Sequence, residues 1–154
     1  MRQITSKTGK TELVTSSVRS VAGIVARAGA RVRIGNVVGG EGAGSLHMYA
    51  VWENLDILSS GAVKIAADPA RQKLLHEREL NPVGVMIGPE VYITVYGNLA
   101  PNYPVVMQRE YSVPRGNLGE ELAILLDIEK FGEDHDYKLA AVVPVIADDL
   151  GRIV

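Results

Sequence analysis

The residues best suited to chemistry lie on one predicted strand, from Ser45 to Trp52. Alternate side chains of a strand share a face, so His47 and Tyr49 point the same way, with Asn54 close by in the sequence. An imidazole can act as a general base near neutral pH, and a tyrosine can orient a phenolic or enolic substrate. The strand rise predicts about 7 Å between the two side chains. That spacing suits two groups holding opposite ends of a small ring and is too long for a direct pair.

A structural role remains open for both faces of this strand. A polar side chain that points inward must be hydrogen-bonded, so His47 also fits a bonded histidine in the interior or at a dimer interface. Trp52 belongs to the opposite face, which favours packing against helices, although a position in a ligand cavity is the alternative. The apolar partners of Trp52 on that face are Leu46, Met48 and Ala50.

Two other patterns have the residue types of a site without its context. Thr8-Gly9-Lys10-Thr11 ends like a phosphate-binding loop, but Ile4 stands where that motif requires glycine, so we expect no nucleotide site. Glu133-Asp134-His135-Asp136 has metal-ligand types, but it lies in a predicted turn with no second cluster at ligand spacing. The sequence therefore predicts a solvated turn there and no metal.

The composition restricts the class of protein and its partners. The chain has 154 residues, sixteen basic and eighteen acidic side chains, a net charge of −2 and no cysteine. This balance gives no electrostatic reason to expect nucleic acid or an anionic membrane as a partner. Disulfides, thiolate metal sites and cysteine nucleophiles are excluded. No run approaches transmembrane length and no leader is recognisable, so we expect a soluble, cytoplasmic protein.

The hydrophobic pattern predicts an α+β protein. Its order over residues 1–98 is strand, helix, strand, strand, helix, strand, which is the ferredoxin-like order. Asp68-Pro69 restarts the second helical region with a capping residue and a proline, and Gly88-Pro89 interrupts the last strand. The predicted elements cover residues 2–7, 11–28, 31–38, 45–52, 54–80 and 85–96.

A weak internal repeat follows this unit. With a shift of 107 positions, Ile4 falls on Tyr111, Val18 on Leu125 and Gly44 on Gly151. The repeat predicts a partial second copy, strand-helix-strand, over residues 105–154, although chance similarity is the alternative. The return strand of this copy has only begun at Val154, which would leave an apolar sheet edge. We therefore expect this segment to complete its sheet within the chain or between chains, in a homodimer or higher oligomer.

Residues 67–75 and 88–96 resemble the second helix and last strand of dimeric α/β-barrel proteins. The nearest group is the antibiotic-biosynthesis-monooxygenase-like one, and the resemblance covers about residues 1–98. It implies that ferredoxin-like units close their sheets face to face and that small molecules bind between sheet and helices. One branch of the superfamily binds haem, but Gln3 and Thr5 occupy the strand where that branch has a partner asparagine, so His76 is expected to lie on a charged surface.

The resemblance also implies roles for individual residues. Trp52, Asn54, Arg78 and Tyr49 would help to position the substrate. From the strand pattern itself we expect His47 to remove a proton and Tyr49 and Arg78 to hold the oxyanion that forms. The expected function is that of a small-molecule enzyme without a cofactor, a monooxygenase or isomerase acting on a hydrophobic oxygenated ring. The alternative is a non-catalytic ligand-binding or oligomeric assembly module on the same fold.

Overall fold

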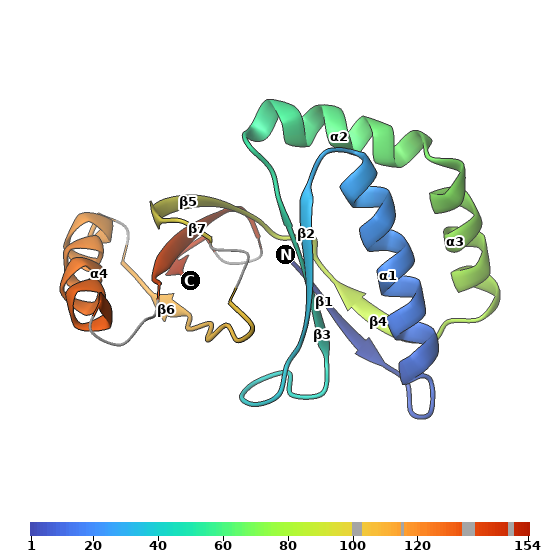
Figure 1. Ribbon diagram of the computed structural model, residues 1–154, viewed down its shortest axis with the longest axis horizontal. Coiled ribbons are helices and arrows are strands. Elements are labelled where there is room, and N and C mark those ends of the chain that lie inside the picture. The colour runs from blue at the N-terminus through green and yellow to red at the C-terminus, as the bar shows by residue number, and fades with distance from the viewer. Residues whose placement is uncertain (100–102, 115, 134–137, 148–149) are drawn as a thin grey trace. The chain divides into compact units, whose positions relative to one another are not determined.

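The computed structural model describes residues 1–99, 103–114, 116–133, 138–147 and 150–154. It divides into two compact units, residues 1–89 and 90–154, each of which is described by itself (Figure 1). Both units combine antiparallel strands with helices. The predicted α+β class is confirmed.

Unit 1 (residues 1–89) is built on a four-stranded antiparallel sheet. Its strands are β1 (Arg2–Ser6), β2 (Arg31–Asn36), β3 (Leu46–Val51) and β4 (Gly84–Ile87), in the spatial order β2-β3-β1-β4. The central strand β1 places Gln3 between His47 of β3 and Ile87 of β4. With helices between β1 and β2 and between β3 and β4, this arrangement is compatible with a ferredoxin-like fold.

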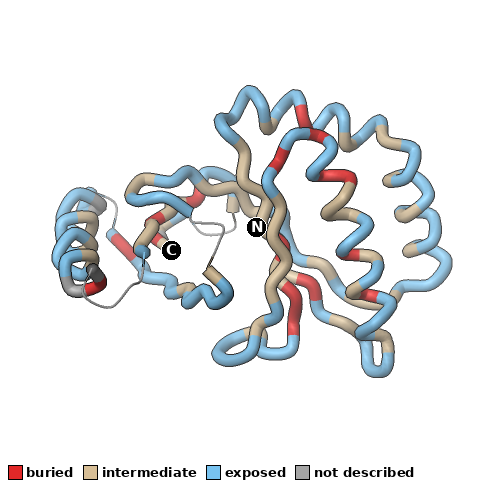
Figure 2. The backbone as a smooth tube through the Cα atoms, viewed as in Figure 1, coloured by how far each residue is buried: buried red, intermediate tan, exposed pale blue. Residues whose placement is uncertain are grey.

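The helices of unit 1 lie on one side of its sheet (Figure 1). They are α1 (Thr11–Arg27), α2 (Leu55–Ala67) and α3 (Pro69–Leu80). The apolar stripe of α1 packs against alternate residues of β1 and β3, because both periodicities bring apolar side chains to one layer. Figure 2 shows buried positions along α1 and the strands that it covers. The buried core contains Ile4, Val14, Val18, Leu46 and Met48.

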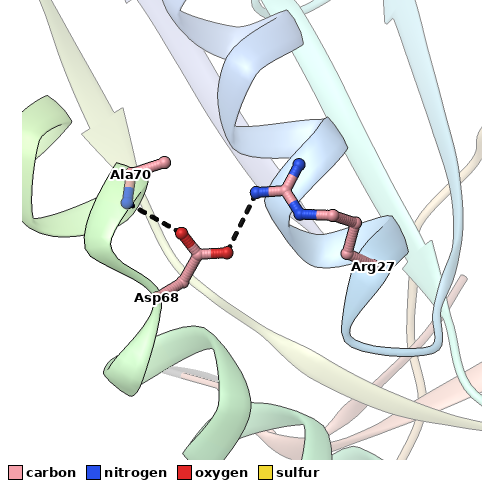
Figure 3. A network of polar contacts seen from close by, with 3 residues as sticks. All are labelled: Arg27, Asp68 and Ala70. Atoms are coloured by element: carbon pink, nitrogen blue, oxygen red, sulfur yellow. Dashed lines mark hydrogen bonds and ion pairs between the residues drawn. The ribbon is translucent and has the colours of Figure 1, made fainter.

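Side-chain caps fix where α2 and α3 begin. The Oδ1 atom of Asn54 accepts from the N–H of Ile57 at 2.9 Å. Asp68 caps α3 by accepting from the N–H of Ala70 at 2.8 Å, and its other oxygen accepts from Arg27 of α1 at 2.9 Å (Figure 3). The restart predicted from Asp68-Pro69 is therefore present, and one carboxylate joins the α2–α3 junction to α1.

The strand expected over residues 85–96 is divided between the two units. β4 ends at Ile87, and β5 (Val91–Gly97) pairs with β7 (Ala140–Ile146) of unit 2 instead of extending the first sheet. Between them Gly88 has a φ of +93°, a conformation that turns the chain, and Pro89 has no N–H to donate. The boundary between the two units falls at this turn, between Pro89 and Glu90.

Unit 2 (residues 90–154) contains α4 (Leu118–Glu133) and two further short strands, β6 (Tyr111–Ser112) and β8 (Arg152–Ile153). β6 pairs with β8, and reciprocal backbone hydrogen bonds of 2.8 and 2.9 Å join Val142 of β7 to Val154. The hydroxyl of Tyr96 on β5 donates to the Glu129 carboxylate on α4. The buried core of this unit contains Val113, Ala141 and Ile153.

Two pairings in unit 2 have counterparts in unit 1 at the same spacing. Tyr111 lies opposite Ile153, as Ile4 lies opposite Leu46 a shift of 107 positions earlier. Val142 and Val154 exchange backbone hydrogen bonds. The residues 107 positions earlier, Gly35 and His47, lie opposite each other on β2 and β3. At these positions the two units have the same strand register.

Candidate functional site

His47 and Tyr49 lie on the side of the unit 1 sheet opposite α1, which we call the distal face. Their neighbours Leu46 and Met48 belong to the core beneath the helices, so the alternate residues point away from it. Across the strands, Gln3 lies beside His47, and Arg33 lies beside Tyr49. The distal face is defined here by Gln3, Thr5, Arg33, His47, Tyr49, Val85 and Ile87.

The two candidate residues form a direct hydrogen bond. The Nδ1 atom of His47 lies 3.0 Å from the Oη atom of Tyr49, and the rings meet edge to face with centroids 5.9 Å apart. The expectation of a separation of about 7 Å without direct contact was therefore wrong. It counted only the rise of the backbone, whereas side chains lean along a strand and a tyrosine is long enough for its hydroxyl to reach the next ring on the same face.

Burial and charge act in opposite directions on Tyr49. Burial raises the pKa of its hydroxyl, and the nearby positive charge of Arg33 lowers it by less. Tyr49 is therefore a neutral phenol near neutral pH and can donate a hydrogen bond. The Nε2 atom of His47 is buried, and the bond between Nδ1 and the Tyr49 hydroxyl is partly buried.

The remainder of the distal face combines polar and apolar side chains. Val85 and Ile87 of β4 are 60% and 56% exposed. Gln3 also contacts the loop between β2 and β3, since a Cβ atom built on Gly42 would lie 2.7 Å from its Nε2 atom. The face therefore offers a hydrogen-bonding centre, an apolar edge and a loop that approaches the centre closely.

Trp52 and Asn54 both have structural roles at helix α2: Trp52 packs against the helix, and Asn54 caps its first turn. A Cβ atom built on Gly61 of α2 would lie 2.3 Å from the indole of Trp52, and one on Gly29 would lie 3.9 Å from it. Trp52 thus packs on the helix side of the sheet. Asn54 uses its side-chain oxygen to cap α2. The structure brings neither indole nor amide into a contact with the His47–Tyr49 pair that would support the expected substrate-binding role.

Arg78 also lies on the helix side. It belongs to α3 and lines a cavity of about 20 Å³ together with Ile4, Val14 and Met86. The core therefore separates it from the distal face. The arginine beside Tyr49 is Arg33, which the sequence analysis did not select. Strand alternation contained the signal, since Val32 and Ile34 pack against the core and leave Arg33 on the other side.

The remaining candidate patterns supply no additional site. His76 is exposed on α3, as expected for a charged surface. Asp134, His135 and Asp136 lie outside the described residues, and within the described part of the chain no three carboxylate or imidazole side chains gather as metal ligands do. A second hollow, of about 500 Å³, follows the surface of α1 between Thr11 and Ser20 and does not include His47 or Tyr49.

No protein-family model matches the chain, and no curated protein is significantly similar to it. Within the described ranges, no helix has both the length and the apolarity needed to cross a bilayer.

Proposed function

We propose that unit 1 binds a small, partly hydrophobic oxygenated ring on the distal face and that Tyr49 and His47 transfer a proton to or from it. The observation that carries this proposal is the 3.0 Å contact between His47 Nδ1 and Tyr49 Oη. It connects a hydroxyl that can reach a ligand to an imidazole that can accept a proton near neutral pH. The reaction class is proton abstraction from a phenol or an acidic carbon, the first step of an isomerase or of a cofactor-independent monooxygenase.

The pair works as a relay in one tautomer of the histidine. With the proton of neutral His47 on Nε2, Nδ1 accepts a hydrogen bond from the Tyr49 hydroxyl. The substrate then gives its proton to Tyr49 Oη while the tyrosine proton moves to Nδ1, so the substrate becomes an anion and His47 an imidazolium. The raised pKa of Tyr49 disfavours a lasting tyrosinate, which suits a residue that passes a proton on.

Arg33 takes the role that was expected of Arg78. Its register position opposite Tyr49 and its effect on the Tyr49 pKa support this role, because both indicate a positive charge near the Tyr49 hydroxyl. A guanidinium there stabilises the oxyanion that develops when the substrate loses its proton. Val85 and Ile87 supply the apolar contact for the ring.

The architecture supports the same proposal at the level of the fold. The strand order β2-β3-β1-β4 in unit 1 is compatible with a ferredoxin-like sheet, and the matched registers of Ile4–Leu46 and Tyr111–Ile153 support a partial second copy in unit 2. We infer a fold of the dimeric α/β-barrel type. The ligand site proposed on the distal face differs from the position between sheet and helices that the resemblance implies, because His47 and Tyr49 lie opposite α1.

The test measures proton transfer directly, because the substrate is not identified. The protein is incubated in D2O with a panel of cyclic enones and unsaturated lactones, and deuterium incorporation is followed by proton NMR. Tyr49→Phe and His47→Gln should each slow catalysed exchange by ~10²–10⁴-fold while leaving ligand binding within a few-fold of the original protein. Tyr92→Phe, which loses a hydroxyl bonded to Glu90, is the control and should exchange normally.

Binding without exchange would favour the non-catalytic alternative. If ligands of the panel bind and Tyr49→Phe weakens their binding, but no exchange occurs above the uncatalysed rate, the distal face is a binding surface only. If neither variant changes binding or exchange, and His47→Gln only lowers the melting temperature, His47 has a structural role and the proposed site is wrong.

One observation favours an assembly module as the second candidate. The residues just before β6, Val105, Val106 and Met107, are 77%, 57% and 76% exposed. Among the described residues β6 pairs only with β8, whereas β1 of unit 1 lies between two strands. An apolar segment beside an incomplete edge is a natural site for association with a second copy. Sedimentation at micromolar concentration should show a homodimer or higher oligomer that Val106→Lys dissociates.

A further inference from the structure

Helix α3 presents an unusual face to the rest of unit 1. Of its twelve residues, only Arg71, Leu74 and Arg78 are partly buried. Their spacing, three and then four residues, places them on one side of the helix. A helix that packs on a core normally turns an apolar stripe inward. This one turns inward two arginines that flank a single leucine.

A third arginine reaches the same region from the sheet. Arg2 of β1 is half-buried, and its Nη1 atom lies 3.1 Å from the sulfur of Met86 on β4. Met86 and Arg78 line the same small cavity. Burial lowers the pKa of Arg2, and the charges of Arg78 and Arg71 lower it further. The charges of Arg71 and Arg78, near the two ends of α3, therefore act on the half-buried guanidinium of Arg2.

No carboxylate of the described residues neutralises this cluster. The ion pairs of unit 1 join Arg27 to Asp68 and Lys73 to Glu77, and none includes the three arginines. Glu77 and Glu79 of α3 lie on its exposed side. Arginine remains charged at every physiological pH, so the cluster cannot relieve the repulsion by losing a proton. A bound anion would relieve it.

We propose that Arg2, Arg71 and Arg78 bind a phosphate group on the helix side of unit 1. Guanidinium groups match phosphate oxygens with paired N–H donors, and three of them can surround one tetrahedral anion. The neighbouring cavity of about 20 Å³ has room for roughly one water, so the anion lies at the surface between β1 and α3. A phosphate there can be free or can belong to a larger molecule that extends into solvent.

This site is separate from the proposed reaction on the distal face. Arg78 is on the helix side of the sheet, whereas His47 and Tyr49 are on the other side. Loss of phosphate binding therefore leaves the proton-transfer proposal intact, and failure of the deuterium-exchange assay leaves the phosphate site intact.

The experiment compares anions at constant ionic strength on the full chain. Thermal melts and isothermal titration with inorganic phosphate should show saturable binding and a higher melting temperature, whereas sodium chloride should show neither. Arg71→Gln and Arg78→Gln should each weaken phosphate binding at least tenfold. Without phosphate both variants should melt at or above the original temperature, because one repelling charge has been removed. Lys73→Gln, the same charge change on the exposed side of α3, should bind phosphate normally.

A second titration, with glycerol 2-phosphate, distinguishes free phosphate from a phosphate monoester as the ligand. Glycerol 2-phosphate that binds at least as tightly as inorganic phosphate indicates a phosphate monoester as the ligand, and weaker binding indicates free phosphate. Equal stabilisation by chloride would mean charge screening only and would overturn the proposal. So would unchanged phosphate binding in both arginine variants, or a loss of stability in either variant before phosphate is added.

Discussion

The indole of Trp52 occupies the space that any side chain at position 61 would need. A Cβ atom built on Gly61 would lie 2.3 and 2.4 Å from two atoms of the ring. Gly61 is the only buried residue of α2, so this contact is where the helix meets the end of β3. The glycine is required there by packing, and the tryptophan acts as a spacer between α2 and the end of α1.

The first prediction tests this contact with alanine at position 61. Gly61→Ala should lower the free energy of unfolding by about 1–3 kcal/mol, because a rigid ring must shift to accommodate one methyl group. Gly23→Ala is the matched control, since a Cβ there meets only the end of the Arg27 side chain at 3.7 Å. Gly23→Ala should raise stability by about 0.5–1 kcal/mol through helix propensity. Urea unfolding of both variants measures the difference.

The second prediction concerns Trp52 itself. Trp52→Ala should cost about 3 kcal/mol, since the packing between β3 and two helices is lost. In the Trp52→Ala background, Gly61→Ala should have almost no further cost, because the ring that opposed the methyl group is gone. A double-mutant cycle measures the coupling of the two positions. Strictly additive effects would show that the clash at Gly61 has another cause.

Local patterns predicted the elements of unit 1 well. Apolar periodicity located α1, alternation located β3, and the capping signal at Asp68-Pro69 located the start of α3. Trp52 shares parity with Leu46 and Met48, and that alone favoured its place beneath the helices. These features depend on residues close in sequence, so the sequence is sufficient for them.

Long-range pairing and side-chain direction were harder to predict. Residues 91–97 alone do not show that β5 pairs with β7 rather than with the four-stranded sheet of unit 1. An apolar strand can pair with an edge strand of either sheet. The bond between His47 and Tyr49 depends on how each side chain leans, which the strand rise does not specify. The position of Arg78 was hard to predict for a similar reason, since a residue type on a helix does not reveal which side of the sheet the helix covers.

The third prediction uses the carboxylate shown in Figure 3. The hydrogen bond from Arg27 is the main reason that the pKa of Asp68 lies below its ordinary value. Desolvation raises this pKa by less than that hydrogen bond lowers it. The N–H of Ala70 and the charge of Arg27 also lower the pKa. A folded-state pKa below the unfolded one means that the unfolded chain binds the proton first as the pH falls. The stability that Asp68 contributes is therefore full above the ordinary carboxyl pKa of about 4 and is lost as the pH falls through the lower folded value.

Asp68→Asn should accordingly remove part of the loss of stability in acid. Its unfolding free energy should lie below that of the original protein at pH 7, and the difference should shrink as the pH falls below about 4. Asp56→Asn, in the exposed first turn of α2, is the control. It should leave the decrease of the unfolding free energy at low pH unchanged. A constant difference between Asp68→Asn and the original protein at every pH would contradict the assignment.

The last prediction concerns Tyr49 at alkaline pH. Its pKa is raised by burial, despite the opposing charge of Arg33, so the unfolded chain loses the phenolic proton at a lower pH than the folded protein does. The stability from the neutral hydroxyl is thus complete below the ordinary tyrosine pKa of about 10 and declines as the pH rises from there through the folded value. Tyr49→Phe has no proton to lose at this position, so its unfolding free energy should fall less steeply between about pH 9 and pH 11.

Tyr111→Phe, on the exposed strand β6, removes the same chemical group elsewhere and should keep the original slope. Urea unfolding at several pH values measures the slopes, and equal slopes for Tyr49→Phe and the original protein would show that the phenol is solvated, which would also remove the support that its burial gives to the proton relay.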